Sequence, residues 1–305
     1  MAEKNLLPSN LRISTHTATC KLNTNIDLKV IAKKLELNTN IIYIEYANFP
    51  VKGVNPKHIS AKKLKKKKVF YNQITIIIQP EIGFMNNVKL FNNGSISMTG
   101  LKNLDHGKMS VNIILDKIRK MILIEDNVSI PALSNSDCKI IDYNIVLINS
   151  DFYIGHEIDR PKLHSLLINN YKIFSSFEPC IYPGVNSKFY WNSDYFDKEY
   201  VGKCYCNKEC SGKGSGKGDG ECKTITIAAF QSGSIIITGA RNIDQINSAY
   251  NFINRIFLRH SKELKKVKAP FLNDQEHVHQ IKSSKNVIYL KKSNIKNFDI
   301  IPSTV

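Results

Sequence analysis

Four cysteines lie close together in the second half of this chain, around a run rich in glycine. Cys204, Cys206, Cys210 and Cys222 fall within 19 residues (222 − 204 + 1) and enclose residues 212–220. Cysteine thiolates are preferred ligands of tetrahedral structural zinc, and a metal would hold such a glycine-rich loop in one conformation. Because the spacing lacks the usual C-x-x-C pair, ordinary thiols of a reducing compartment are the alternative. The sequence therefore indicates that no cofactor is required. The four cysteines are candidate ligands of a structural Zn²⁺ ion.

No pattern of catalytic residues stands out elsewhere. The glycine run lacks the Gly-Lys-Ser/Thr ending and the strand-to-helix context of a phosphate-binding loop. His277 and His279 lie in a polar tail without a Glu-x-x-His partner, which is typical of a solvated segment. Because no nucleophile motif, carboxylate pair or cofactor fingerprint is evident, we expect a protein that is not an enzyme.

A binding function is indicated by two similar stretches of sequence. Residues 91–105 and 230–244 keep a constant offset of 139, from 230 − 91 and from 244 − 105. Each starts with a phenylalanine and continues through a glycine turn, an apolar strand and the start of a helix. A repeat of this kind predicts two similar halves related by a pseudo-twofold axis within a monomer.

The elements around each stretch follow the same order of strand, short helix, strands and long helix. The first half has predicted strands over 11–20, 74–78, 88–91 and 95–99 and helices over 26–35 and 105–124. The second half has predicted strands over 145–148, 224–230 and 234–238 and helices over 160–169 and 244–258. We therefore expect an α+β fold, in which two units join edge to edge into one continuous curved antiparallel sheet with helices on one side.

The two halves also set the expected boundaries. We expect an N-terminal tail over 1–10, a first repeat over 11–125, a linker over 126–136, a second repeat over 137–260 and a C-terminal extension over 261–305. The repeats carry different inserts, rich in lysine over 57–68 and in cysteine and glycine over 193–222. The lysine run could contact phosphate, act as a nuclear-type address or simply be solvated.

The charge points to a polyanionic partner. Lys and Arg number 43 against 26 Asp and Glu in 305 residues, a formal net charge of +17. Nucleic acid and an anionic membrane surface both fit that balance. No apolar run is long enough to span a membrane, and residues 1–10 lack the apolar segment of a secretory signal. We therefore expect an intracellular protein without a membrane span.

Segments 174–184, 230–233 and 238–241 of the second half form one pattern, which segments 14–15, 20–22, 26–29 and 91–102 of the first half follow less closely. This pattern resembles the two repeats of the TATA-box-binding protein family. Between the inserts it covers about residues 11–260, and it is similar to the divergent versions that large DNA viruses carry. It implies a saddle with helices on the convex side, acting in the nucleus or in the cytoplasmic factory or virion of such a virus.

This saddle implies binding to the minor groove of AT-rich double-stranded DNA, which aromatic wedges bend. The implied wedges are Phe91 with Phe49 in the first repeat and Phe230 with Tyr182 in the second. A competing register would put Phe70 in the place of Phe49. The tyrosine departs from the family, and its hydroxyl would need a partner at the kink.

The resemblance also implies side chains for the floor of the groove contact. These are Thr99 and Thr238 with the apolar Met98 and Ile237. Asn149 matches one of a central pair of asparagines, which suit A·T base edges because these present only acceptors in the minor groove. Its mate in the first repeat falls on Leu11 or Thr15, according to where the gap is placed, with Asn10 adjacent.

The resemblance further implies basic side chains along the rim of the sheet, where they would contact the DNA phosphates. Lys102 and Arg241 match basic positions of the family, whereas Ser95 and Ser234 replace its lysine after the turn glycine. Since each phosphate contact adds to the salt dependence of binding, the two serines predict a shallower dependence.

The loop with Glu178 and Ile181 corresponds to the family's contact with a TFIIB-like factor, which bridges to RNA polymerase. Cys180 replaces a second acidic residue there, so an altered partner is expected. The resemblance thus implies a transcription initiation factor that bends AT-rich promoter DNA. The alternative is a scaffold of the transcription machinery that binds DNA weakly or without sequence preference.

Overall fold

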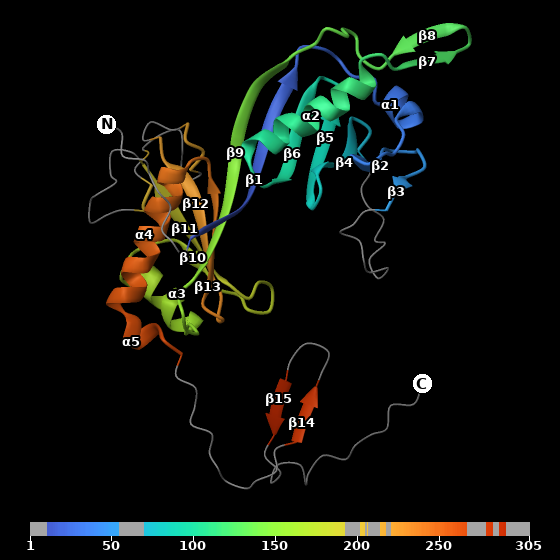
Figure 1. Cartoon of the computed structure of the whole chain (residues 1–305). Helices are drawn as coiled ribbons and strands as arrows, with labels where there is room; N and C mark the ends of the chain where they lie inside the picture. Colours follow the sequence, from blue (N-terminus) through green and yellow to red (C-terminus); the bar gives the residue numbers. More distant parts are fainter. Residues whose placement is uncertain are drawn as a thin grey trace. The chain divides into compact units, whose positions relative to one another are not determined.

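The computed structural model describes residues 11–54, 70–192, 202–204, 206, 214–217, 221–266, 279–282 and 287–290 (Figure 1). The chain falls into two units, Met1–Lys266 and Val267–Val305, each of which is described by itself. In the second unit, β14 (His279–Lys282) pairs with β15 (Val287–Leu290) in an antiparallel hairpin. All other described elements belong to the first unit.

The first unit is built on one antiparallel sheet of eleven strands in the order β10-β11-β12-β13-β9-β1-β6-β5-β4-β2-β3. The first-half strands are β1 (Arg12–Leu22), β2 (Ile41–Glu45), β3 (Lys52–Gly53), β4 (Gln73–Glu81), β5 (Phe84–Phe91) and β6 (Ser95–Leu101). The second-half strands are β9 (Ile140–Tyr153), β10 (Ser175–Ser176), β11 (Val185–Trp191), β12 (Lys223–Ala229) and β13 (Ser234–Ala240). The pairing of β1 with β9 joins the halves and shifts register at three places, which bends and twists both strands.

The two repeats expected from the sequence are confirmed by the strand order. Outward from the central pair, β6, β5 and β4 follow in the first half as β13, β12 and β11 do in the second. The matching turns close in the same way, because the amides of Gly94 and Gly233 donate to the carbonyls of Phe91 (3.0 Å) and Phe230 (2.9 Å). Both glycines have positive φ, +82° and +92°, a conformation that other residues adopt with strain.

Helices cover one face of the sheet in each half. The long helices are α2 (Leu104–Ile118) and α4 (Ile243–Arg259), and the short ones are α1 (Leu28–Lys34) and α3 (Arg160–Asn169). Asn103 and Asn242, which are 139 residues apart (242 − 103), cap the long helices by accepting from backbone amides. No helix in the described part of the chain is long and apolar enough to cross a membrane.

Each half has its own hydrophobic core between sheet and helices. The first includes Ala18, Ile76, Ile96 and Ile114, and the second includes Ile148, Ile227, Ile246 and Ile253. Both cores use the same sheet face, because Ala18 pairs with Ile145, which packs against both of them. The expected fold class is therefore confirmed: α+β, with one continuous antiparallel sheet and helices on one side.

The end of the first repeat differs from the expectation. The helix expected over 105–124 ends at Ile118, and Ile122 begins β7 (Ile122–Glu125), which pairs with β8 (Val128–Pro131) in a separate hairpin. Asp126 and Asn127 form its turn with φ of +49° and +63°, which short polar residues tolerate best. The segment expected as a linker over 126–136 thus contains a strand.

The second repeat also extends further than expected. A short helix, α5 (Ser261–Leu264), follows α4 and buries Leu264 completely in the second core. Its backbone is tied to the start of α3, because the Asp159 amide donates to the Leu264 carbonyl (2.8 Å) and the Lys266 amide to that of Glu157 (3.0 Å). Residues 261–266 therefore belong to the folded first unit, while residues 1–10 and 57–68 lie outside the described residues.

Candidate nucleic-acid interface

The sheet face opposite α2 and α4, here called the open face, is lined by short polar side chains. Residues paired on neighbouring strands point to the same face, and successive residues alternate. Ala18 and Met98 pair and are both completely buried, so the adjacent pair of Thr17 and Thr99 lies on the open face. The same alternation places there Thr15, Thr19, Thr75, Asn87, Ser95, Ser97, Asn149, Asn186, Thr224, Thr226, Ser234 and Thr238.

Asn149 lies at the centre of this face, between the two halves. Its Nδ2 donates to the Thr15 hydroxyl across the β1–β9 junction (3.1 Å), and its Oδ1 accepts from the Thr238 hydroxyl. The amide is only partly buried and is held by side chains from both neighbouring strands. The structure therefore fixes the orientation of a polar group at the middle of the open face.

The register shows which residue is the counterpart of Asn149. Asn149 pairs with Thr238, and Thr17 pairs with Thr99 in the equivalent place. Thr17 is therefore the counterpart, and both alternatives left by the sequence are wrong. Leu11 is buried in the second core, while Thr15 is the cross-strand partner of Asn149 itself.

Met98 and Ile237 do not lie where the sequence analysis expected them. Both are completely buried under the helices, in the first and second cores respectively. The error has a simple cause, since each directly precedes a threonine that does lie on the open face, and neighbouring residues of a strand point to opposite faces. The apolar side chain on this face of β13 is that of Ile236, which is 36% exposed.

The two aromatic residues expected together in the second repeat are in contact. The rings of Tyr182 and Phe230 lie 5.7 Å apart at 63°, an edge-to-face arrangement. Both pack over Gly184, where an added Cβ would lie 2.9 Å from the tyrosine ring and 3.2 Å from the phenylalanine ring. The glycine thus leaves room for the pair at the end of the sheet.

In the first repeat the same position is occupied by a different residue from the one expected. Tyr182 lies two residues before the strand position opposite Phe230. Gln73 is opposite Phe91, and the residue two positions before it is Tyr71. Tyr71 is 67% exposed, so its side chain is available at this end of the sheet.

Phe49, the expected partner of Phe91, lies elsewhere. It packs against the first core and its ring centroid is 5.4 Å from that of Tyr46. Phe70, the competing candidate, is 55% exposed and adjacent to Tyr71. The expected register is thus wrong for Phe49 and off by one residue for Phe70.

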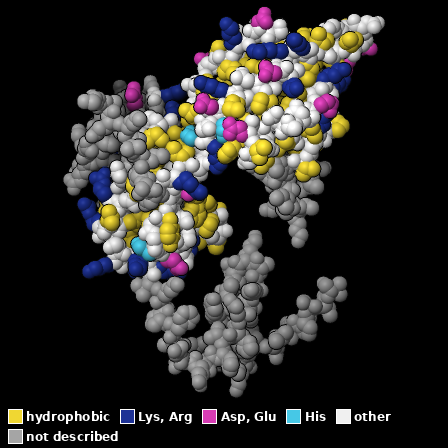
Figure 2. Space-filling view, viewed as in Figure 1, with side chains coloured by type: hydrophobic (Ala, Val, Ile, Leu, Met, Phe, Trp, Pro, Cys, Tyr) yellow, Lys and Arg dark blue, Asp and Glu magenta, His cyan; other side chains and the backbone are white. Residues whose placement is uncertain are grey.

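Basic side chains lie on the rim and on the open face. Lys102 is exposed, and its Nζ donates to the Ser14 carbonyl (2.8 Å). Arg241 is exposed, and burial, with a smaller effect of this guanidinium, lowers the pKa of its neighbour Lys223. The sequence analysis missed the open-face lysines Lys21, Lys89 and Lys188, which alternation along a known strand register identifies. Other Lys and Arg side chains are spread over the side seen in Figure 2, among acidic ones.

The loop with Glu178 and Ile181 is exposed. Ile181 is 81% accessible, and its amide and that of Tyr182 both donate to the Glu178 carbonyl (2.9 Å each). This turn therefore presents Glu178, Cys180 and Ile181 together at the surface, next to the aromatic pair.

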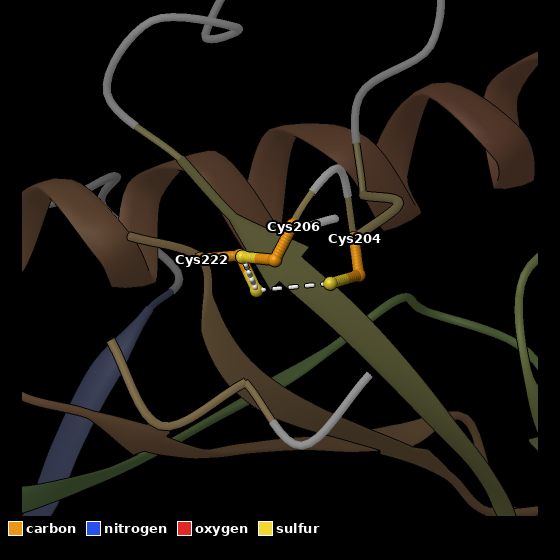
Figure 3. Close-up of side chains that lie close together, drawn as sticks. All are labelled: Cys204, Cys206 and Cys222. Atoms are coloured by element: carbon orange, nitrogen blue, oxygen red, sulfur yellow. Dashed lines mark hydrogen bonds between the residues drawn. The ribbon is translucent and has the colours of Figure 1, made fainter. Parts of the chain in front are cut away.

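Three of the four clustered cysteines converge. The Sγ atoms of Cys204, Cys206 and Cys222 lie within 4.8 Å of one another, and the side chains point toward a common centre (Figure 3). Cys222 Sγ is 3.1 Å from that of Cys204 and 3.3 Å from that of Cys206. Cys210, the fourth expected ligand, lies outside the described residues.

Comparison with known proteins gives one extensive sequence match. No protein-family model matches the chain. A "TATA-box-binding protein-like" protein of Acanthamoeba polyphaga mimivirus is 33% identical over 312 residues, which cover 98% of this chain and 77% of that protein. Among solved structures, Methanococcus jannaschii TBP has a TM-score of 0.45 and 15% identity, over 83% of this chain and 99% of that one. The extent of the viral match shows that the chain belongs to the TATA-box-binding protein-like family of transcription factors.

Proposed function

We propose that the open face binds the minor groove of AT-rich promoter DNA and that aromatic residues at its two ends bend the duplex. The observation that carries the proposal is the matched placement of Tyr71 with Phe91 and of Tyr182 with Phe230, at equivalent positions of two repeats. The open face between and around them carries many hydroxyl and amide groups and the lysines Lys21, Lys89 and Lys188, besides the carboxylates of Glu45 and Asp151. Asp151, an acidic residue on this face, is paired with Arg12 (2.9 Å).

Readout of A·T pairs follows from the donors at the centre. The minor-groove edges of A·T pairs present only acceptors, whereas G·C pairs add a donor. Asn149 and the surrounding threonine hydroxyls supply donors, and their short side chains allow the sheet to approach the groove floor. Because Thr17 takes the place of a second asparagine, we expect a weaker preference for A·T than two amides would give.

Bending follows from the aromatic pairs. An aromatic ring inserted at a base step costs a few kcal/mol of unstacking, which the wider contact on bent DNA offsets. The phenylalanine of each pair would unstack the step, while the tyrosine hydroxyl keeps a water or phosphate partner at the edge of the kink. Lys102 and Arg241 would contact the phosphates on either side.

The function is one of binding without catalysis. The exposed turn with Glu178 and Ile181 would contact a TFIIB-like factor and, through it, RNA polymerase. Since the viral relative belongs to a mimivirus, we propose that the chain acts in the nucleus or in the cytoplasmic factory or virion of a large DNA virus.

A bending assay tests this proposal. Fluorescence resonance energy transfer across end-labelled duplexes is measured with the full chain on AT-rich and GC-rich DNA. We expect bending of the AT-rich duplex and its loss in a Phe91→Ala/Phe230→Ala variant. Phe174→Ala is a matched control, because Phe174 is 63% exposed but precedes β10 outside both pairs. Binding without bending, or equal bending by the double variant, would favour the scaffold alternative and contradict the proposal.

A further inference from the structure

The thiols of Cys204, Cys206 and Cys222 come from both arms of the connection between β11 and β12. The first arm carries Cys204 and Cys206, and it is tied to β11 because the Tyr190 amide donates to the Gly202 carbonyl (2.9 Å). Cys222 immediately precedes β12 and is completely buried. The three sulfur atoms therefore meet although Cys206 and Cys222 are 16 positions apart in the sequence (222 − 206).

The second arm is held equally closely. The Thr224 amide donates to the Gly214 carbonyl (2.8 Å), and the Gly216 amide donates to that of Cys222 (2.9 Å). These bonds keep residues 214–217 beside the start of β12, where Ser215 forms a bridge with Lys223. Backbone hydrogen bonds thus hold both arms of the connection, and the three thiols lie together between them.

The spacing of the sulfur atoms suits one tetrahedral metal. A Zn–S bond of about 2.3 Å places two thiolates on the same ion roughly 3.8 Å apart. The three sulfurs, with contacts of 3.1 and 3.3 Å and none beyond 4.8 Å, need to move by only a fraction of an ångström to reach that spacing. Cys204 and Cys206 are half-buried, so the ion can enter from their side.

The local charge also suits a thiolate site. Three thiolates around Zn²⁺ leave one net negative charge, which cations nearby stabilise. Lys223 follows Cys222 directly, and the Arg241 side chain lies beside Gly216 of the second arm. We infer that Cys204, Cys206 and Cys222 supply three of the four ligands of a Zn²⁺ ion, with a fourth donor or water completing the tetrahedron, and that the ion joins the two arms of the β11–β12 connection beside the basic rim of the second repeat.

This inference does not depend on DNA binding and is tested on the full chain alone. The purified, reduced protein is given one equivalent of zinc, and bound metal is counted after gel filtration. We expect one zinc per chain, and with cobalt we expect the thiolate charge-transfer and d–d bands of a tetrahedral site. Absence of bound zinc, or an octahedral cobalt spectrum, would overturn the inference.

Variants and protection identify the ligands. Cys222→Ser, Cys204→Ser and Cys206→Ser should each weaken zinc binding by at least about tenfold. Cys180→Ser is the matched control, because Cys180 is exposed and lies outside the cluster, and it should keep one zinc. Unchanged binding in the three cluster variants would contradict the assignment.

A measurement on the unmodified chain covers the case in which a variant fails to fold. Mass spectrometry after alkylation should show the half-buried Cys204 and Cys206 protected by zinc and modified again after a chelator is added, with Cys180 modified throughout. Burial raises the pKa of Cys20 to about 12, so its thiol stays protonated and slow to react in both states. Equal modification of the cluster with and without zinc would overturn the inference.

Discussion

At the scale of single residues, two residues compete for the aromatic wedge beside Phe91. The strand register of the structure gives Tyr71, whereas the sequence analysis expected Phe49. Tyr71→Ala should reduce DNA bending about as much as Tyr182→Ala, because the two occupy equivalent positions. Phe49→Ala should leave bending unchanged but lower the free energy of unfolding by about 1–3 kcal/mol, since Phe49 packs against the first core. Energy transfer measures the first effect and urea denaturation the second. If Phe49→Ala loses bending while the DNA is fully occupied, Phe49 is the wedge, as the sequence analysis expected.

A second residue-scale prediction concerns the central amide. Thr17→Asn would place an amide opposite Thr99, as Asn149 is placed opposite Thr238. We expect a larger ratio of affinities for AT-rich over GC-rich duplexes, by about fivefold, because one more donor faces the acceptors of A·T pairs. Asn149→Ala should reduce the same ratio. Competition binding at fixed salt gives both values, and an unchanged ratio in the two variants would mean that the centre does not read base edges.

At the scale of elements, the matched turns of β5–β6 and β12–β13 should tolerate no side chain at their glycines. A Cβ at Gly94 would overlap the Thr24 carbonyl, and one at Gly233 would overlap that of His156. Each alanine variant should therefore lose more than about 2 kcal/mol of unfolding free energy. Gly83→Ala is the matched control, because Gly83 has φ of +87° but open space around it, and it should lose only about 1 kcal/mol. If urea denaturation gives Gly83→Ala the same loss as Gly94→Ala and Gly233→Ala, the strain of a positive φ accounts for all three losses and the overlap with the carbonyls adds nothing.

The elements also show what a sequence can and cannot specify. Local chemistry was sufficient for the turn glycines and for α3, which spans Arg160–Asn169 as expected. Local chemistry did not identify the sites that depend on strand pairing, since Thr17 and Tyr71 are recognised only from the strands opposite them. The end of α2 was missed because Ile122 continues the apolar spacing of the helix although its neighbours form a β-hairpin.

At the scale of the whole first unit, the two halves share one sheet but differ in what they add to it. The first repeat ends in the β7–β8 hairpin, while the second carries the cysteine cluster and ends in α5. Asn149 is matched by Thr17, so the centre is asymmetric too. Because a pseudo-twofold protein with such differences presents unequal ends, we expect the proposed promoter binding to have one preferred orientation.

The junction of the halves gives the unit a predicted sensitivity to acid. His16 lies on the helix side of β1 between Leu101 and Ile148, and its Nδ1 is buried without a hydrogen-bond partner among the described residues. Burial lowers its pKa below 6.5, an effect that a backbone hydrogen bond with Leu101 partly offsets. The unfolded chain therefore takes up this proton first as pH falls.

Stability should thus fall as pH drops below about 6.5, with a slope from this residue of at most about 1.4 kcal/mol per pH unit. Urea denaturation of the full chain across that range measures the slope. His16→Leu should flatten it, because an apolar side chain suits this site and binds no proton. His156→Gln, a change at a half-buried histidine beside α3, serves as the control for general loss of a histidine. If the His16→Leu slope equals that of the unmodified chain, the junction does not titrate and the acid sensitivity lies elsewhere.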